Sequence, residues 1–332
     1  MNETLSNSIL LSVVIPVFNS EKTLSQCLDS LLQQDVTDYE IIAVDDGSTD
    51  HSLAMLQDYE SRYANVKTYH KKNGGQGDAR NFGIARSAGQ YIAFVDSDDT
   101  VNSNYFQKIY AHLMDAPDML VLAYKRFYDY KPGILERIYP FSKPLPSGDA
   151  LNMYTTPSIL YQIEGSVCIK VIRRELLLAH SSIRFSGIRL AEDLEFSLKL
   201  FPLCQKIEFC PTPLYNYRIH KQSSNFDSAY IEGFIYFMDS VCTYFRRHQL
   251  FERFKSELEI IFIKQLLISN LRRLLYGGGK HAASFKLLLT KLKSEFPRFR
   301  NNNYLKTEPF YIRTAVWFCC RFPSAIQFLL KF

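Results

Sequence analysis

The segment YIAFVDSDDT, residues 91–100, joins an apolar, strand-like run directly to three carboxylates. Asp96, Asp98 and Asp99 are so close in sequence that their charges repel, and that cost rises steeply away from bulk water. A bound divalent cation would offset the repulsion, since Mg²⁺ and Mn²⁺ prefer hard oxygen ligands. The alternative is that the acids only cap the helix expected after residue 102. Three acids exceed what capping requires, so we favour the cation.

Outward from this segment, the first 130 residues alternate strand and helix patterns. Apolar runs predict strands, and amphipathic segments between them predict helices. Strands are expected at 10–18, 39–46, 66–71, 91–99 and 118–128, and helices at 21–34, from 49 or 50 to about 62, at 77–88 and at 103–114. This alternation is typical of an α/β fold with a mostly parallel sheet flanked by helices.

Polar clusters follow the first four of these strands. They read FNS, DDGSTD, KNGGQGDAR and DSDD in chain order. In open α/β sheets, ligands bind outside the carboxyl ends of the strands, so these clusters are expected to meet at one site. The sequence therefore predicts a single ligand site along that edge of the sheet.

The second and third clusters each have two interpretations. Asp45 and Asp46 can accept hydrogen bonds from a nucleobase or a ribose, but Asp, Ser and Thr also build turns and helix caps. The glycines of 72–81 let backbone N–H groups approach an anion ahead of a helix, and Arg80 adds a fixed cation. The alternative is a flexible loop closed by a surface arginine, because the loop matches no established glycine fingerprint.

Two further segments carry candidate residues. Glu192 and Asp193 open an amphipathic helix at 190–201, where the helix dipole favours acids whatever their function. The segment 215–226, YNYRIHKQSSNF, includes Tyr217, Arg218, His220 and Lys221, which could contact a diphosphate. His220 by itself is more often an ordinary surface or core histidine.

Charge and composition divide the chain near residue 225. Residues 226–332 contain 17 Lys and Arg against 8 Asp and Glu, whereas residues 1–225 contain 22 against 26. From about residue 230 the pattern is helical, most clearly at 257–276, where GGGK at 277–280 ends it. We therefore expect a mainly helical C-terminal region, which either packs as an appendage or contacts anionic lipid through its basic residues. The first interpretation is slightly favoured.

The cysteine pattern and the N-terminal sequence both bear on the cellular compartment of the protein. Seven cysteines without a CxxC pair suggest neither a zinc site nor a disulfide framework, as in a reducing cytosol. The first 16 residues lack the basic region and cleavage site of a signal peptide, and no uncharged apolar run is long enough for a membrane span. A cytoplasmic protein is expected, whether free or peripheral at the inner face of the membrane.

Taken together, the ordered segments resemble the family 2 glycosyltransferases, which have the GT-A fold. The markers are VVIPVFNSEKTLSQCLDSLLQQ, YEIIAVDDGSTD, NGGQGDARNFGIARSAGQYIAFVDSDD and AED, and the resemblance covers about residues 9–225. It is closest to bacterial enzymes that build capsule, exopolysaccharide or lipopolysaccharide. It implies a nucleotide-sugar-binding catalytic domain at 1–225, followed by the basic, helical region at 226–332.

The resemblance implies a role for each matching residue. Asp193 would be the catalytic base, and Arg80 would lie near the nucleobase or the diphosphate. Asp96 and Asp98 would hold Mn²⁺ or Mg²⁺, with His220 as a looser third ligand. The remaining residues of the donor site would be Pro16, Val17, Asn19, Glu21, Asp45, Asp46, Gly77 and Ser97, of which Asp45 and Asp46 would hold uracil or ribose.

The implied activity is inverting transfer of a hexose-type sugar from a nucleotide sugar, by family habit a UDP-sugar. The acceptor would be a growing surface glycan or a lipid-linked oligosaccharide, and no nucleic acid is expected as a partner. Assembly as a homo-oligomer is compatible with this activity. Two alternatives stay open: a non-catalytic nucleotide-sugar-binding scaffold, and a sugar-1-phosphate nucleotidyltransferase. The second would carry a glycine-rich loop after the first strand, where this chain has PVFNSEKTL.

Overall fold

The computed structural model describes residues 9–128, 137–139, 151–187, 191–220, 228–269 and 282–321. The chain forms two compact units. The first contains Met1–Thr155 and Glu164–Ser223, and the second contains Thr156–Ile163 and Ser224–Phe332. The boundary expected at residue 225 and Lys221 lie outside the described residues.

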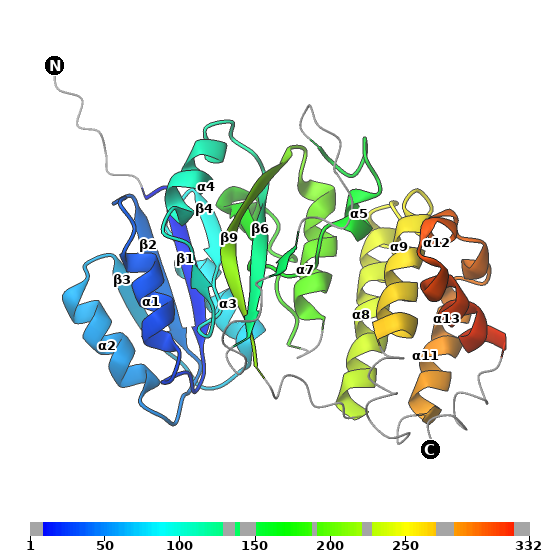
Figure 1. The fold of residues 1–332 in the computed structure, drawn as a ribbon, viewed down its shortest axis with the longest axis horizontal. Coiled ribbons are helices and arrows are strands. Elements are labelled where there is room, and N and C mark those ends of the chain that lie inside the picture. Colours follow the sequence, from blue (N-terminus) through cyan, green and yellow to red (C-terminus); the bar gives the residue numbers. More distant parts are fainter. Residues whose placement is uncertain are drawn as a thin grey trace. The chain divides into compact units, whose positions relative to one another are not determined.

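Four parallel strands form the N-terminal half of the sheet in the first unit (Figure 1). They are β1 (Leu11–Val17), β2 (Tyr39–Asp45), β3 (Val66–His70) and β4 (Tyr91–Phe94), in the order β3-β2-β1-β4. Every residue of β1, β2 and β4 is buried, as expected for continuous apolar runs between layers of helices. Chain order reverses beside β1, which is the position where such sheets bind ligands.

Helices connect these strands as the sequence predicts. They are α1 (Leu24–Leu32), α2 (Ser52–Arg62), α3 (Gln76–Arg86) and α4 (Tyr105–Leu113). The helix α3 packs closely on β1 at Gly83, where an added Cβ would lie 2.3 Å from Val14 Cγ1. This contact holds the start of α3 at the carboxyl edge of the sheet.

The second half of the sheet is mixed, and the sequence patterns missed most of it. Its strands are β8 (Lys170–Arg173), β6 (Met119–Tyr128), β9 (Ile207–Ile219), the short β5 (Thr100–Val101) and β7 (Arg137–Tyr139). β8 runs antiparallel to both β4 and β6, whereas β9 runs parallel to β6. Only β6 was expected; the helix α7 (Glu192–Leu200) matches the one predicted at 190–201. The predicted fold class, a mostly parallel mixed sheet flanked by helices, is confirmed.

The regular elements described in the second unit are all helices (Figure 1). It contains α5 (Ile159–Gln162), α8 (Ser228–Arg247), α9 (Lys255–Phe262), α11 (Ala282–Glu295), α12 (Asn303–Thr307) and α13 (Phe310–Arg321). The helix expected at 257–276 is α9 followed by a π-helical stretch, Ile263–Ser269; residues 270–281, with the GGGK breaker, lie outside the described residues. Within the described part of the chain, no helix has the length and apolar character to cross a bilayer.

Candidate active site

A cavity of about 1160 Å³ lies in the first unit at the carboxyl ends of the parallel strands. It is lined by the loops after β1, β2, β3 and β4, by the start of α7, and by residues of β6 and β9. All the predicted site residues line it except Asp45 and Gly77. Segments far apart in sequence thus meet at one edge of the sheet.

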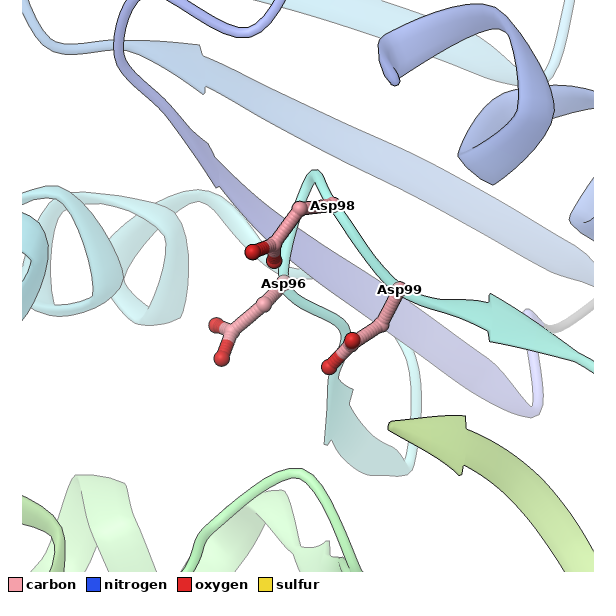
Figure 2. Close-up of side chains that lie close together, drawn as sticks. All are labelled: Asp96, Asp98 and Asp99. Atoms are coloured by element: carbon pink, nitrogen blue, oxygen red, sulfur yellow. The ribbon is translucent and has the colours of Figure 1, made fainter. Parts of the chain in front are cut away.

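The turn between β4 and β5 carries the three carboxylates of the DSDD segment (Figure 2). Ligand oxygens of Asp96, Asp98 and Asp99 lie within 4.8 Å of one another. The side chains of Asp96 and Asp98 are 27% and 41% exposed, so both reach the cavity. Ser97 between them is held in place, since its hydroxyl lies 2.7 Å from that of Ser20.

Asp99 faces the protein interior instead. Its Oδ2 accepts a hydrogen bond from the Tyr215 hydroxyl at 2.5 Å, and its Oδ1 accepts one from the Arg218 backbone N–H at 2.7 Å. Burial, together with the charges of Asp96 and Asp98, raises the pKa of Asp99 to about 8. Asp99 therefore ties the turn to β9, whereas Asp96 and Asp98 line the cavity.

Hard oxygen donors at this turn fit a divalent cation. Two partly exposed carboxylates separated by one residue are a common protein contribution to a Mg²⁺ or Mn²⁺ site, with water and phosphate completing the shell. His220 Nε2 lies 2.8 Å from Asp98 Oδ2, so the histidine is close enough to orient that ligand. Asp96 and Asp98 would hold the cation, and His220 would support or join them.

Arg80 connects this turn to the predicted base. Its side chain is only 1% exposed, yet it contacts three carboxylates. Nη2 lies 2.7 Å from Asp96 Oδ1, and Nη1 lies 2.6 Å from Asp193 Oδ1 and 3.3 Å from Glu192 Oε1. The guanidinium also lies 5.4 Å from the ring of Phe185. Because both terminal nitrogens of Arg80 contact carboxylates, its main effect is to position the acids.

The start of α7 places Asp193 and Glu192 against that guanidinium. Asp193 Oδ2 also accepts a hydrogen bond from the Val167 N–H at 3.3 Å. Burial raises the pKa of Asp193, although Arg80 opposes the rise. Burial likewise raises the pKa of Glu192 to about 7, again against Arg80. A carboxylate with a raised pKa at a cavity wall suits proton transfer near neutral pH.

The loop after β1 lines another part of the cavity and is hydrogen-bonded to the loop after β2. Pro16, Val17, Asn19 and Glu21 all line the cavity. Asn19 Oδ1 accepts a hydrogen bond from the Thr49 N–H at 2.8 Å. Glu21 Oε2 accepts one from the His51 N–H at 3.2 Å, and contacts with His51 lower the Glu21 pKa. These side chains shape the wall chiefly by holding the two loops together.

The two adjacent aspartates after β2 differ in position. Asp46 lines the cavity and accepts hydrogen bonds from the backbone N–H groups of Gly74 and Gly75, at 2.9 and 2.7 Å. It thereby anchors the glycine-rich loop. Asp45 is fully buried, and its Oδ2 lies 2.7 Å from His70 Nδ1. Asp45 was also expected to hold uracil or ribose; its carboxylate is paired with His70 of β3, whereas Asp46 lines the cavity.

Gly77, also expected at the donor site, lies beside the cavity lining. An added Cβ would lie 3.0 Å from Phe185 Cβ and 3.1 Å from Glu192 Oε2. The glycine therefore permits close packing of α3 on the segment before α7. Arg218 is also structural, because its Nε donates to the Asp98 carbonyl at 2.6 Å.

Several cavity residues were missed by sequence reasoning. Tyr124, Arg126, Glu164 and Ser166 line the far wall, and Tyr217 was considered only as a diphosphate contact. Tyr124 and Arg126 lie in the strand β6. The apolar residues that precede them predicted a buried strand, so the sequence did not show that these two side chains share the face toward the cavity. Glu164 lies in the irregular middle of the chain, where no pattern marked it.

A model of the family described as "Glycosyl transferase family 2" matches residues 12–177. The chain belongs to this family. The membership expected from the sequence is thus confirmed, and the family is one of enzymes. Its GT-A members commonly use a divalent metal, in keeping with the donor set at Asp96 and Asp98.

Similar proteins come from bacteria. The chain is 35% identical over 219 residues to the uncharacterized glycosyltransferase EpsJ of Bacillus subtilis, covering 64% of this chain and 62% of EpsJ. It is 31% identical over 265 residues to a poly(ribitol-phosphate) beta-glucosyltransferase of Bacillus spizizenii, covering 77% of this chain and 40% of that protein. The chain thus spans less than two thirds of either relative.

Solved structures extend the likeness of fold. The crystal structure of Staphylococcus aureus TarS 1–349 in complex with UDP matches with a TM-score of 0.66 and 20% identity, covering 97% of this chain and 89% of that one. A structure of GalNAc-T7 with UDP, GalNAc and Mn²⁺ matches with a TM-score of 0.52 and 17% identity, covering 70% and 48%. At these identities the comparison shows the shared GT-A fold.

Proposed function

We propose that this chain is an inverting glycosyltransferase that moves a hexose-type sugar from a nucleotide sugar to a hydroxyl group of a surface glycan or lipid-linked acceptor. The observation that carries the proposal is the Arg80 fork, which joins Asp96 of the DSDD turn to Asp193 at 2.7 and 2.6 Å. The DSDD turn and Asp193, the proposed base, thus line one cavity, which supports the proposal. UDP is the proposed nucleotide, since it is the one present in the TarS complex.

Donor binding would use the wall made by the loops after β1, β2 and β3. A nucleoside would lie among Pro16, Asn19 and Asp46, and the diphosphate would reach the DSDD turn. Mn²⁺ or Mg²⁺ held by Asp96 and Asp98, with His220 beside them, would neutralise the negative charge that develops on the leaving diphosphate. The catalytic domain would correspond to the first compact unit.

The transfer step needs one base, which takes up the single proton that is released. The acceptor oxygen forms a bond to the anomeric carbon while the bond from that carbon to the diphosphate oxygen breaks, and the diphosphate leaves with the electron pair. Asp193 accepts the proton of the acceptor hydroxyl. Attack opposite the leaving group inverts the anomeric centre, and no covalent enzyme intermediate is required. A positioned base contributes on the order of 10²–10⁴ in rate.

The decisive experiment replaces Asp193 by Asn, which keeps the shape and removes the base. Transfer and donor hydrolysis should fall by about 10²- to 10⁴-fold, while UDP affinity in Mn²⁺ stays unchanged. Asp58→Asn is the control, since Asp58 lies on the surface helix α2, where it pairs with Arg62. Unchanged transfer by Asp193→Asn would reject the base, and UDP binding without any turnover by the wild type would favour the scaffold alternative.

We further propose that α13 contacts anionic lipid, where a lipid-linked acceptor would lie. Phe310, Tyr311 and Trp317 are 74%, 62% and 56% exposed on this helix, and the Arg313 guanidinium lies 6.0 Å from the Phe310 ring. The opposite face, with Val316, is buried. Exposed aromatic residues beside cations are typical of helices that lie in a membrane interface.

Positive charge gathers at the same helix. Burial raises the pKa of Cys320, and the charges of Arg300 and Lys293 oppose that rise, which places both cations near α13. The acids of the neighbouring segments, Glu295 and Glu308, are paired with Arg246 and Lys264. Each exposed cation near an anionic membrane contributes about 1 kcal/mol of binding.

Trp317 is the only tryptophan of the chain, so its fluorescence reports on this helix directly. Vesicles of phosphatidylcholine with phosphatidylglycerol should shift its emission to shorter wavelength, whereas pure phosphatidylcholine should not. The variant Phe310→Ser should weaken co-sedimentation, and Met114→Ser, at an exposed site of the first unit, should not. Equal partitioning into both kinds of vesicle, or a shift on raising protein concentration without lipid, would argue against lipid contact.

A further inference from the structure

One wall of the cavity carries side chains that the donor chemistry does not use. Tyr124 and Arg126 alternate along β6, and Tyr217 on β9 lies directly beside Arg126 in the parallel ladder. Because strand side chains alternate between faces, these three share the face that lines the cavity. Glu164, from the loop before β8, lines the same wall.

These side chains form a polar network with an aromatic surface. The Tyr124 hydroxyl donates to Glu164 Oε2 at 2.5 Å, and Arg126 Nη2 donates to the Tyr124 oxygen at 2.8 Å. Arg126 Nη2 lies 3.5 Å from Glu164 Oε1, so the charges of the pair balance. Glu164 is 49% exposed at its side chain, and Tyr217 is 39% exposed. The wall thus offers donors, acceptors and a ring, without net charge.

The wall lies beyond the DSDD turn from the nucleoside loops. Those loops follow β1 and β2, whereas β6 and β9 lie on the other side of β4 in the strand order β2-β1-β4-β8-β6-β9. If the nucleoside binds beside β1 and the diphosphate binds at the turn after β4, the nucleotide does not occupy this wall. The wall is then accessible to a different molecule. That molecule would approach the base from the side opposite the nucleoside.

A short loop connects the wall to the base. Glu164 and Val167 are three residues apart, which limits their separation to about 11 Å, and the Val167 N–H donates to Asp193 Oδ2. The fully buried Lys170 fastens this loop, since its Nζ donates to the carbonyls of Glu164 and Ser166 at 2.6 and 2.5 Å. Glu164 therefore lies on the same loop that contacts Asp193 through Val167.

We propose that Tyr124, Arg126, Glu164 and Tyr217 form a subsite for a neutral sugar ring of the acceptor. This rests on the proposed glycosyltransferase function. A sugar ring has an apolar C–H face that packs on an aromatic ring, and hydroxyl groups that both donate and accept hydrogen bonds, which is the combination offered here. A polyanionic acceptor fits less well, because the paired Arg126 and Glu164 leave no net positive charge to attract it.

The test is a binding titration that does not depend on turnover. Full-length protein with Mn²⁺ and UDP is titrated, by ligand-observed NMR, with methyl glucoside, N-acetylglucosamine, lactose and glycerol 3-phosphate as probes. A neutral saccharide should bind the wild type, and Glu164→Gln and Tyr217→Ala should each weaken it by about tenfold. The controls Asp58→Asn and Tyr236→Ala, at an acid and a tyrosine exposed elsewhere, should bind as the wild type does.

Each other outcome has a definite meaning. No saccharide binding to the wild type, or binding of glycerol 3-phosphate alone, overturns the subsite. Unchanged affinity in both variants also overturns it. Loss of UDP-sugar hydrolysis in Glu164→Gln, with saccharide binding kept, assigns the wall to the donor sugar. A different result would reject the proposed function itself: a wild type that binds saccharide but neither binds UDP nor hydrolyses a UDP-sugar.

Discussion

The guanidinium of Arg80 lies 2.6 Å from the carboxylate of Asp193, although 113 residues separate them in sequence. The other arm of the same fork holds Asp96 at 2.7 Å. One buried arginine therefore sets the spacing between the proposed base and the proposed cation ligand. The planar guanidinium of arginine has N–H donors in fixed directions, so it can hold two carboxylates at a set distance, which the flexible ammonium group of lysine cannot do.

Loss of Arg80 should destabilise the fold. Arg80→Met would leave the carboxylates of Asp96, Glu192 and Asp193 crowded without their cation, and breaking such a buried pair costs about 3–5 kcal/mol. Urea unfolding measures the change in free energy. Arg62→Met, at a surface pair on α2, is the control and should change it by less than about 1 kcal/mol. An Arg80→Met protein as stable as the wild type would contradict the positioning role.

The pH dependence of transfer should show the environment of Asp193. Burial raises the pKa of Asp193 above its usual value, against the opposing effects of Arg80 and Lys170. The base acts when ionised, so kcat should fall as the pH drops through this raised pKa, at a higher pH than an exposed aspartate would give. Initial rates between about pH 4 and pH 9 test this. A rate that stays constant down to the usual aspartate range would disprove it.

Removal of Asp98 should separate cation-dependent from cation-independent UDP binding. Asp98→Ala removes a carboxylate oxygen exposed to the cavity, so UDP affinity should fall in Mn²⁺ but hardly change in EDTA. Calorimetric titration in both buffers gives the comparison, and Asp58→Asn again serves as the control. Equal weakening in both buffers would mean that Asp98 contacts the nucleotide itself, without a cation.

Close packing of α3 on β1 makes Gly83 intolerant of a side chain. Gly83→Ala would place a Cβ 2.3 Å from Val14 Cγ1, and such overpacking costs about 1–3 kcal/mol. Gly187→Ala is a matched control, because no atom lies within 4 Å of its added Cβ. Thermal unfolding compares the two. A Gly83→Ala protein with an unchanged midpoint would show that α3 can shift away from the sheet.

Local patterns were enough for the first half of the fold. The runs at 10–18 and 39–46 became buried parallel strands, because both faces of such a strand are covered and its sequence is mostly apolar. The short run at 66–71 became the partly buried edge strand β3. The antiparallel β8 and the long β9 were missed. β9 contains two prolines and a register irregularity against β6, so its sequence lacks a strand-like alternation.

The sequence by itself determined the family, the parallel half of the sheet and the residue types at its carboxyl edge, because strand periodicity and ordered motifs are local properties. Tertiary structure alone decided which of the paired acids faces the cavity. Asp45 and Asp46 are neighbours, yet backbone alternation turns one to His70 and the other to the glycine loop. It also decided that Arg80 clasps Asp193 and that Glu164 joins β6, since both contacts depend on long-range packing that no local spacing records.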